Sequence, residues 1–415
     1  MTDLAKRFAN NPILRPADVQ PSAPGMRVEC LLNPGAFRFR GRTGLLLRVA
    51  ERPPQTASAV STPVLDPSAP GGVRIVSVSR QDPELKASDP RVFNWKGVDY
   101  LTTLSHLRLA WSDDGERFTA DPKSIKAETL AALAVPRWLA SEMELTPEYL
   151  RQLQRDPALW IRARPGTAAA LAKSLFACER TDYAPDALRF TGTQDLFRTE
   201  QFTSGQFEIQ DLASQLVGLA CAPKPGETWW DTCAGEGGKT LHLADLMANK
   251  GLIWATDRHP KRLDTLKRRA GRAKLFNYRT ALWDGGTHLP TKTKFDGILV
   301  DAPCSGVGTW SRNPHARWAT SPDDVRELAV TQRALLEAVA GSLKPGGRLI
   351  YSVCTLTRSE TTAIADAFTL AHPELEPLPL PIAPSGSSDP SRVMLWPQEI
   401  NANGMFVAGW RLKKS

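Results

Sequence analysis

The chain has few cysteines, no metal-binding pattern and no long apolar run. Its 415 residues include six cysteines, none in a C-x-x-C pair and none beside a histidine cluster, which argues against a structural zinc site. Cysteines spread this widely are typical of free thiols in a reducing compartment: Cys30, Cys178, Cys221, Cys233, Cys304 and Cys354. No apolar run approaches the roughly 18 residues of a membrane span, and the N-terminal sequence lacks the apolar core of a signal peptide. We therefore expect a cytoplasmic protein without metal or membrane attachment.

Negative charge is in deficit. The chain has 52 Lys and Arg against 44 Asp and Glu, and its formal net charge is +8. This balance favours a polyanionic partner, RNA or DNA. A basic protein without such a partner fits the charge equally well.

Composition divides the chain into three predicted segments. Residues 1–122 are rich in Pro and Gly turns between short β-type runs, which predicts a β-rich segment. Its clearest predicted strands are 28–32, 44–50, 73–78 and 99–104. Residues 123–200 predict a small α+β segment, with a helix over 127–143, a strand over 159–164 and a helix over 168–177.

Residues 201–415 alternate between strand and helix patterns. This alternation predicts an α/β fold with a mostly parallel, doubly wound sheet. The predicted strands are 228–233, 252–257, 275–280, 296–302 and 347–354. The predicted helices are 238–249, 260–273, 322–342 and 359–371. Two last runs, 393–397 and 404–412, predict an antiparallel hairpin at the sheet edge.

A Gly-rich turn, D-T-C-A-G-E-G-G-K-T, follows the first of these strands at 231–240. It fails as a P-loop because Cys233 occupies the place of the first glycine, and it fails as a dinucleotide fingerprint because Thr240 replaces the last one. Two interpretations remain. The segment is either a strand-to-helix turn that lets a ligand approach the backbone, or a tight turn that binds nothing.

Acidic residues close three successive strands of this segment. Asp257, Asp284 and Asp301 each follow a predicted strand, at the edge where open α/β sheets bind ligands. An isolated aspartate there is more often a helix cap. Three in succession favour a nucleotide-type site, in which Asp257 can accept hydrogen bonds from ribose hydroxyls.

Two thiols also follow predicted buried strands. Cys304 lies in D-A-P-C-S-G and Cys354 in S-V-C-T. Either one alone could be an ordinary core cysteine. Two of them at the rim of a nucleotide-type site favour covalent chemistry on a carbon acceptor.

Residues from about 126 onward resemble the Nol/Nop/Sun family of RNA cytosine-5 methyltransferases. The resemblance rests on the Gly-rich turn, G-Q-F-E-I-Q-D-L-A-S-Q-L (205–216), D-A-P-C-S-G-V-G-T (301–309), R-N-P-H-A-R-W (312–318), the S-V-C-T segment and L-W-P…N-G-M-F-V-A (395–408). It implies a Rossmann-like S-adenosylmethionine methyltransferase fold. It also implies methylation of carbon 5 of cytosine in RNA, either ribosomal or transfer RNA.

The resemblance also implies roles for individual residues. Cys354 would attack carbon 6 of cytosine, Cys304 would assist release of the product, Asp301 would hydrogen-bond the cytosine edge, and Lys239 would orient it. The residues implied to hold S-adenosylmethionine are Cys233, Ala234, Gly235, Glu236, Gly237, Gly238, Lys239, Asp257, Asp284 and Asp301. Two departures stand out: Glu236 and Val353 occupy positions where the family usually has Pro and Thr.

Chemistry requires one thiol to be ionised. A thiolate that adds to carbon 6 makes carbon 5 nucleophilic, and a free thiol with a pKa of about 8.5 is mostly protonated at neutral pH. Lys239, Arg312 and Arg317 are the candidate cations. Spacing alone does not choose between Cys304 and Cys354, since DNA cytosine methylases use the Pro-Cys thiol; the family resemblance favours Cys354.

RNA contacts are expected in three places. The segment 126–200 resembles the RNA-contacting extension of the family, and R-N-P-H-A-R-W lies close to a thiol in the sequence. The basic predicted helix at 259–274 is either a phosphate-binding surface or a solvated helix face.

Residues 10–120 instead resemble the first third of a five-bladed β-propeller family of mannoside phosphorylases, in which Asp89 would match the proton donor. Two blades cannot close a propeller, so we expect no glycoside activity. Two alternatives to the methyltransferase function remain: a catalytically impaired RNA-binding protein of the same fold, prompted by Glu236, and a remnant phosphorylase.

Overall fold

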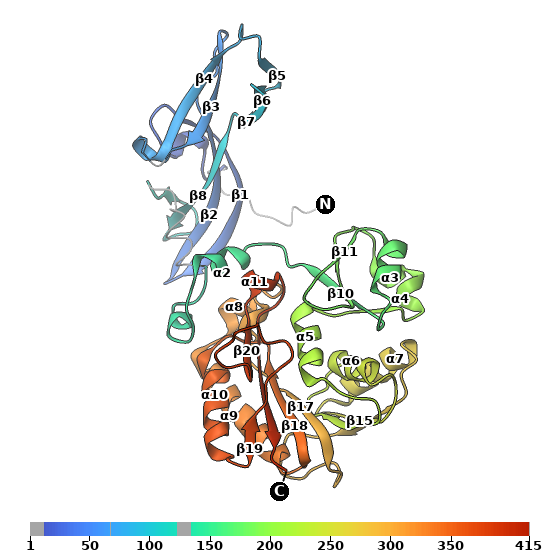
Figure 1. Cartoon of the computed structure of the whole chain (residues 1–415). Coiled ribbons are helices and arrows are strands. Elements are labelled where there is room, and N and C mark those ends of the chain that lie inside the picture. Colours follow the sequence, from blue (N-terminus) through green and yellow to red (C-terminus); the bar gives the residue numbers. More distant parts are fainter. Residues whose placement is uncertain (1–11, 67, 123–133, 415) are drawn as a thin grey trace, which may run out of the picture. The chain divides into compact units, whose positions relative to one another are not determined.

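The computed structural model describes residues 12–66, 68–122 and 134–414, and the chain divides into two compact units, Met1–Leu130 and Ala131–Ser415 (Figure 1). Each unit has its own core and is described by itself. The predicted three-part division, at 122 and 200, stays a prediction. Within the described residues, none of the helices combines the length and the apolar character needed to cross a bilayer.

The N-terminal unit consists of antiparallel strands, as predicted for a β-rich segment. One sheet has the order β1-β2-β8-β9, β3 pairs with β4, and β5, β6 and β7 form a third sheet. The bounds are β1 Arg27–Phe39, β2 Arg42–Arg52, β3 Ala59–Leu65, β4 Val73–Ser79, β5 Leu85–Asp89, β6 Val92–Trp95, β7 Val98–Leu101, β8 Leu104–Ser112 and β9 Thr119–Ala120, with 3₁₀ turns η1 Pro16–Asp18 and η2 Pro70–Gly72.

The single strand predicted over 99–104 is wrong, because it divides between β7 and β8. At the break, the hydroxyl of Thr102 donates to the carbonyl oxygen of Pro90 at 2.8 Å, and its backbone N–H donates to that of Arg91 at 2.9 Å. These contacts turn the chain between the two strands.

A small antiparallel sheet begins the C-terminal unit, with the order β11-β12-β10-β13. Its strands are β10 Leu159–Ala163, β11 Cys178–Arg180, β12 Ala187–Phe190 and β13 Phe207–Ile209. The helices of this part are η3 Arg137–Ser141, α2 Pro147–Gln152, α3 Ala168–Leu175, η4 Leu196–Arg198 and α4 Glu200–Thr203.

The helix predicted over 127–143 is wrong over its described part. Residues 127–133 lie outside the described residues, and the remainder holds only the 3₁₀ turn η3. Pro136 precedes this turn with extended backbone angles (φ −60°, ψ 142°). A proline disfavours helical geometry at the residue before it and lacks a backbone N–H, so an α-helix through this position is not formed.

The main sheet has the order β16-β15-β14-β17-β18-β21-β19, with β20 paired to β21. The neighbours from β16 to β18 are parallel, and β21 is antiparallel to β18, β19 and β20. The predicted doubly wound sheet and the antiparallel pairing of the last two strands are confirmed, but β21 lies inside the sheet, between β18 and β19, and not at its edge. The strands are β14 Thr228–Asp231, β15 Leu252–Asp257, β16 Tyr278–Leu282, β17 Phe295–Asp301, β18 Leu343–Val353, β19 Leu375–Pro377, β20 Arg392–Leu395 and β21 Met405–Leu412.

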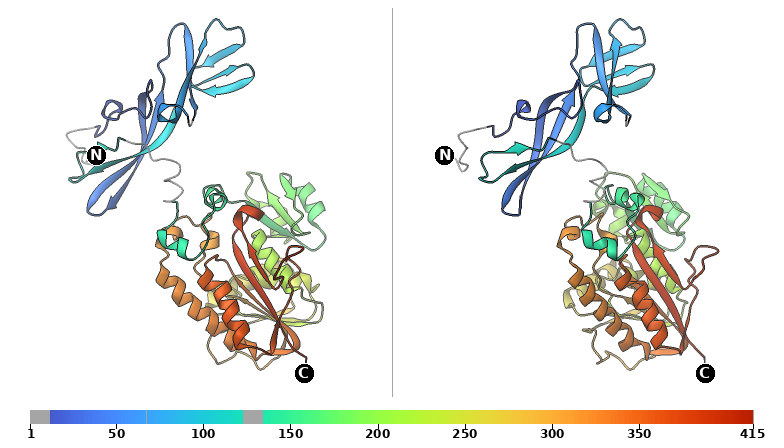
Figure 2. Two further views of the ribbon diagram at one scale, coloured as in Figure 1. Left: turned by 60° about the vertical axis from the view of Figure 1, so that its left-hand side comes forward. Right: turned by 90° about the vertical axis from the view of Figure 1, so that its left-hand side faces the viewer.

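Helices cover both faces of this sheet, and each face has its own apolar core. Adjacent residues of a strand alternate between the cores: Trp229 packs with α5, α6 and α7, and Trp230 packs with α9 and α10. Figure 2 shows α9 and α10 (orange) along one face. The helices are α5 Leu212–Cys221, α6 Gly238–Leu246, α7 Pro260–Arg272, α8 Ala316–Ala319, α9 Pro322–Ala340, α10 Thr362–Ala371 and α11 Pro397–Ile400, with 3₁₀ turns η5 Val307–Thr309 and η6 Arg358–Glu360.

Buried ion pairs join the small sheet to the main sheet's helices. Arg162 of β10 and Arg164 both bind Asp245 of α6, the latter at 2.7 Å. On β13, Glu208 binds Arg272 of α7 at 2.6 Å. The side chains of Arg162, Asp245 and Glu208 are at most 4% exposed, so each charge depends on its partners for compensation.

We expect Asp245→Asn to lower the free energy of unfolding of the C-terminal unit by about 3–5 kcal/mol, because it leaves the Arg162 guanidinium buried without a counter-charge. Urea unfolding followed by tryptophan fluorescence measures the loss. The control is Glu148→Gln, which removes an exposed pair with Arg151 and should change the value by less than about 0.5 kcal/mol. Equal effects of the two variants would contradict a stabilising role for the buried pair.

Candidate functional site

A cavity of about 600 Å³ lies at the carboxyl ends of β14, β15 and β17. The parallel sheet places Asp231, Asp257 and Asp301, which end these three strands, at the same edge. Nine of the ten residues predicted to hold the cofactor line this cavity: Cys233, Ala234, Gly235, Glu236, Gly238, Lys239, Asp257, Asp284 and Asp301. The tenth, Gly237, is a buried residue of the same turn.

The Gly-rich turn forms the floor of the cavity. Gly235 and Gly237 have φ values of +55° and +86°, which side-chain-bearing residues rarely adopt. A Cβ atom on Gly237 would lie 2.5 Å from Leu266 Cγ, so only glycine allows this close packing on α7. The turn thereby brings the N-terminus of α6 to the cavity, where backbone N–H groups favour negative charge.

Asp257 fixes the turn from the next strand. One carboxylate oxygen accepts the backbone N–H of Gly235 at 3.0 Å, and the other accepts that of His259 at 2.8 Å. Each oxygen keeps a lone pair for a ligand hydroxyl. Asp284 accepts the backbone N–H of Gly286 at 2.9 Å on the far side of the cavity, and the side chain of Glu236 is exposed.

Asp231 is a site residue that the sequence reasoning missed. Its side chain is 1% exposed; Oδ2 accepts the Thr240 hydroxyl at 2.6 Å, and Oδ1 has no hydrogen-bond partner among the described residues. Burial raises the pKa of this carboxyl to about 7, against the lowering effect of Thr240. The sequence reasoning missed it because the predicted strand ran to residue 233, whereas β14 ends at Asp231.

Lys239 and Asp301 form an ion pair at the side of the cavity nearest the thiols. Lys239 Nζ lies 2.7 Å from Asp301 Oδ2, and the Ser352 hydroxyl donates to Asp301 Oδ1 at 2.7 Å. Burial is the largest single effect and lowers the pKa of Lys239, but the charge and hydrogen bond of Asp301, together with the charges of Cys354 and Asp231, give a net rise. Lys239 is therefore a fixed cation.

The two predicted thiols lie in contact, with Cys304 Sγ and Cys354 Sγ 3.3 Å apart. The hydrogen bond between them lowers the pKa of Cys354, assisted by the charge of Lys239, and raises the pKa of Cys304 well above its usual value. These directions favour Cys354 over Cys304 as the thiol that ionises.

The other two predicted cations have structural roles. Arg317 is buried and donates to the carbonyl oxygens of Ala134 and Leu153, at 3.0 and 3.2 Å. Arg312 lies 3.6 Å from Asp211 Oδ2. Of the three candidates, Lys239 is the one whose charge lowers the pKa of Cys354.

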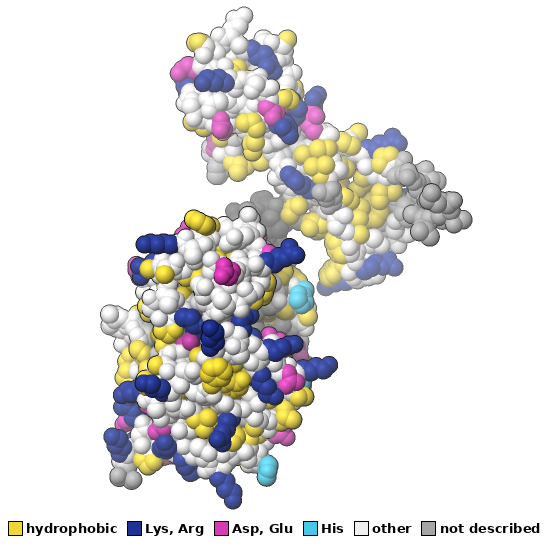
Figure 3. Space-filling view, turned by 90° about the vertical axis from the view of Figure 1, so that its right-hand side faces the viewer, with side chains coloured by type: hydrophobic (Ala, Val, Ile, Leu, Met, Phe, Trp, Pro, Cys, Tyr) yellow, Lys and Arg dark blue, Asp and Glu magenta, His cyan; other side chains and the backbone are white. Residues whose placement is uncertain are grey.

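The basic helix α7 uses part of its charge internally. Arg269 and Arg272 bind the buried Glu208, while Lys261, Arg262, Lys267 and Arg268 are exposed. On this side of the C-terminal unit, Lys and Arg side chains are dispersed rather than gathered in one patch (Figure 3). A phosphate-binding role for the helix stays a prediction.

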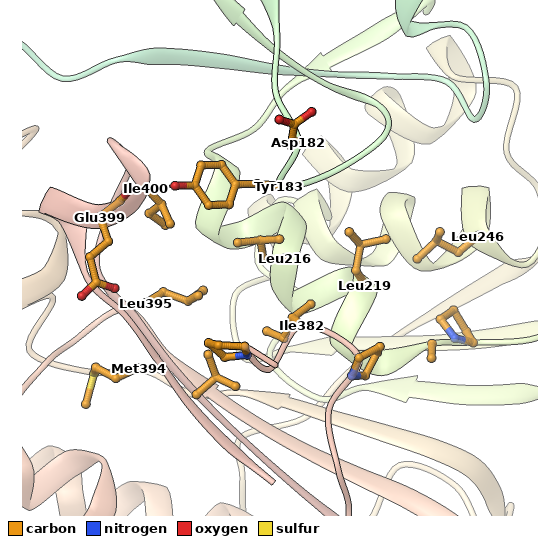
Figure 4. Close-up of a pocket in the computed structure, with 15 residues that line it drawn as sticks. Asp182, Tyr183, Leu216, Leu219, Leu246, Ile382, Met394, Leu395, Glu399 and Ile400 are labelled. Atoms are coloured by element: carbon orange, nitrogen blue, oxygen red, sulfur yellow. Dashed lines mark hydrogen bonds between the residues drawn. The ribbon is translucent and has the colours of Figure 1, made fainter. Parts of the chain in front are cut away.

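A second cavity, of about 730 Å³, is lined by α5, α6, β20, α11 and the segment around Ile382 (Figure 4). Its walls are mostly apolar, and the Tyr183 hydroxyl beside it donates to the carbonyl oxygen of Glu399 at 2.8 Å. None of its lining side chains is a cysteine, histidine or lysine, so the first cavity is the candidate catalytic site.

The first cavity fits S-adenosylmethionine. The glycine turn allows close approach of a ligand, Asp257 offers acceptors for ribose hydroxyls, and the unpartnered Oδ1 of Asp231 suits an ammonium group. In the described part of the chain, His, Cys, Asp and Glu side chains form no group of three or more that could hold a metal.

For the N-terminal unit, a solved beta-1,2-mannobiose phosphorylase from Listeria innocua is 34% identical over 29% of this chain and 35% of its own, with a TM-score of 0.25. A likeness at that score supports no conclusion about fold or activity.

For the C-terminal unit the similarities are extensive. A family model described as 16S rRNA methyltransferase RsmB/F matches residues 218–411. A probable ribosomal RNA small subunit methyltransferase B from Synechocystis is 33% identical over 73% of this chain and 70% of its own length. Its Bacillus subtilis namesake is 36% identical over 57% of this chain and 54% of its own, so the chain spans only part of such relatives. The solved structure of PH0851 is 29% identical, with a TM-score of 0.63 over 70% of this chain and 69% of its own. As the Nol/Nop/Sun resemblance predicts, the chain belongs to the family of 16S rRNA methyltransferases RsmB/F.

Proposed function

We propose that this chain methylates carbon 5 of cytosine in RNA, and that the RNA is that of the small ribosomal subunit. The observation that carries the proposal is the thiol pair, 3.3 Å apart, beside a cavity that fits S-adenosylmethionine. The names of the relatives support small-subunit ribosomal RNA as the substrate class. A methyltransferase acting on an oxygen or nitrogen needs no thiol, whereas carbon 5 of cytosine needs covalent activation.

S-adenosylmethionine would supply the methyl group when bound. Asp257 would accept hydrogen bonds from its ribose hydroxyls, Asp284 would bind its adenine amino group, and Asp231 would hold its ammonium group. The turn from Cys233 to Lys239 and the carboxylate of Asp301 complete the site.

Cys354 activates the base. Its thiolate forms a bond to carbon 6, and the displaced electron pair makes carbon 5 nucleophilic toward the methyl group. Lys239 and Asp301, locked in their ion pair, orient the ring edge of the cytosine. A base then removes the carbon 5 proton, the carbon 6–sulfur bond breaks, and Cys354 leaves as a thiolate; Cys304, which carries the shared proton, assists this release. The target base must be unpaired or flipped out to reach the thiol.

Nucleoside analysis tests the reaction. The protein is incubated with methyl-labelled S-adenosylmethionine and total RNA from cells lacking its gene, and the RNA is fractionated and digested for mass spectrometry. We expect labelled 5-methylcytosine in small-subunit ribosomal RNA. Label in transfer RNA would correct the RNA class. A folded protein that transfers no label would favour the RNA-binding alternative, with Glu236 as the first residue to replace.

The two thiols should respond differently to substitution. We expect Cys354→Ala to lower methyl transfer at least about a thousandfold and to abolish the protein–RNA adduct, because the nucleophile is gone. Cys304→Ala should accumulate the adduct, because attack survives while release is impaired. Denaturing gels with labelled RNA distinguish the outcomes, and Cys178→Ala, a half-buried thiol of the small sheet, is the control. Adduct formation by Cys354→Ala but not by Cys304→Ala would reverse the assignment.

Cofactor affinity should depend on pH through Asp231. The carboxylate binds a cation and the protonated acid does not, so with a pKa of about 7 the affinity should be full above neutral pH. Below pH 6 it should fall by about tenfold per pH unit. Calorimetric titration of S-adenosylmethionine between pH 5 and 8.5 measures this. Asp231→Asn should bind more weakly with a flat profile, and Asp284→Asn should keep the slope. An unchanged slope in Asp231→Asn would refute the role.

A further inference from the structure

Glu360 is a buried carboxylate that neither the sequence reasoning nor the proposed reaction uses. It ends the 3₁₀ turn η6, it is 0% exposed, and it is not among the residues that line the cofactor cavity. A buried carboxylate is costly unless hydrogen bonds compensate its charge, so its partners explain its position.

Four groups donate hydrogen bonds to this carboxylate, and a further hydroxyl lies close to it. Oε1 accepts the backbone N–H of Ser305 and the side-chain amide of Gln332, each at 2.9 Å. Oε2 accepts the hydroxyls of Ser305 and Thr357, at 2.5 and 2.7 Å, and the Thr355 hydroxyl oxygen lies 3.3 Å from it. All four bonded groups act as donors, which suits an acceptor-only, ionised carboxylate.

The donors come from both thiol-bearing turns. Ser305 follows Cys304 directly, and Thr355 follows Cys354 directly. Because the Ser305 hydroxyl donates to Glu360, the Thr355 hydroxyl donates to Ser305 Oγ, at 2.8 Å. The Gln332 amide, which donates to the Pro303 carbonyl oxygen at 2.9 Å, joins the same network to α9.

We propose that Glu360 is a positioning residue for the two thiols: it fastens the turn after Cys304 to the turn after Cys354 and sets a negative charge beside Cys304. The inference rests on the proposed function, because the proposed reaction assigns different roles to Cys354 and Cys304.

The charges around the pair are unequal. The charged and titratable groups facing it are Lys239, Asp301, Tyr351 and Glu360. After the hydrogen bond that Cys304 donates to Cys354, and after burial, the charge of Glu360 is among the causes that raise the pKa of Cys304. Lys239 acts on Cys354 in the opposite direction. Glu360 therefore helps to retain the proton on Cys304 while Cys354 ionises.

Thiol alkylation tests the inference without RNA or cofactor, so its outcome is separate from that of the methyltransferase proposal. The full chain is treated with iodoacetamide at pH 7, and modification of Cys304 and Cys354 is followed by peptide mass spectrometry. In the native protein Cys354 should react at least tenfold faster than Cys304. In Glu360→Gln the ratio of the two alkylation rates should fall at least fivefold. In a separate methylation assay, with RNA and cofactor present, kcat of this variant should fall while KM for RNA stays unchanged.

Glu208→Gln is the matched control. It neutralises another buried carboxylate, one that accepts from Arg269 and Arg272, and its thiol ratio should stay within twofold of the native value. A folded Glu360→Gln protein in which Cys354 and Cys304 are alkylated at the native ratio of rates would overturn the proposal.

A second variant covers the case in which Glu360→Gln does not fold. Ser305→Ala removes one hydroxyl from the network and keeps the charge. Phenylarsine oxide, a reagent that bridges adjacent thiols, should bind this variant at least fivefold more weakly than the native protein, because the Cys304 turn is less restrained. Native affinity in the variant would contradict the positioning role.

Discussion

The parallel alignment of β14, β15, β17 and β18 is the constraint on which the site depends. Parallel strands end at one edge of a sheet, so residues far apart in the sequence converge there: Asp231, Asp257, Asp301 and Cys354. The same alignment requires a crossover after each strand. The crossover helices cover both faces of the sheet and create the two cores that hold the strand ends in place.

At that edge the sheet carries carboxylates that are wholly or partly buried, although burying a charged group costs stability. Asp257 and Asp301 each accept protein donors at both oxygens, and Glu360 accepts four donors behind the thiols. The exception is Asp231, whose Oδ1 remains without a partner among the described residues. Unsatisfied groups of this kind are expected where a protein keeps a position for a ligand.

Local pattern was sufficient for most strands and helices of the main sheet, although β19 and α5 were not predicted. The strand predicted over 252–257 matches β15 residue for residue, because a continuous apolar run ends there in a polar residue. Local pattern was insufficient for the helix predicted over 127–143, where Pro136 outweighed the apolar periodicity. It was also insufficient for Glu360, whose donors include Ser305, 55 residues away, and for Arg317, whose partners belong to two other segments. Contacts of this range depend on the finished fold.

The position of β21 has a consequence for synthesis of the chain. Met405–Leu412 lies between β18 and β19 and also pairs with β20. It is the last strand of the sheet to leave the ribosome, so β18, which carries the segment leading to Cys354, has an unpaired edge until then. Exposed strand edges are sites of misassociation, and domains complete their folding as units during synthesis. A ribosome stalled before residue 405 would therefore hold a nascent chain that contains both thiols and an open sheet.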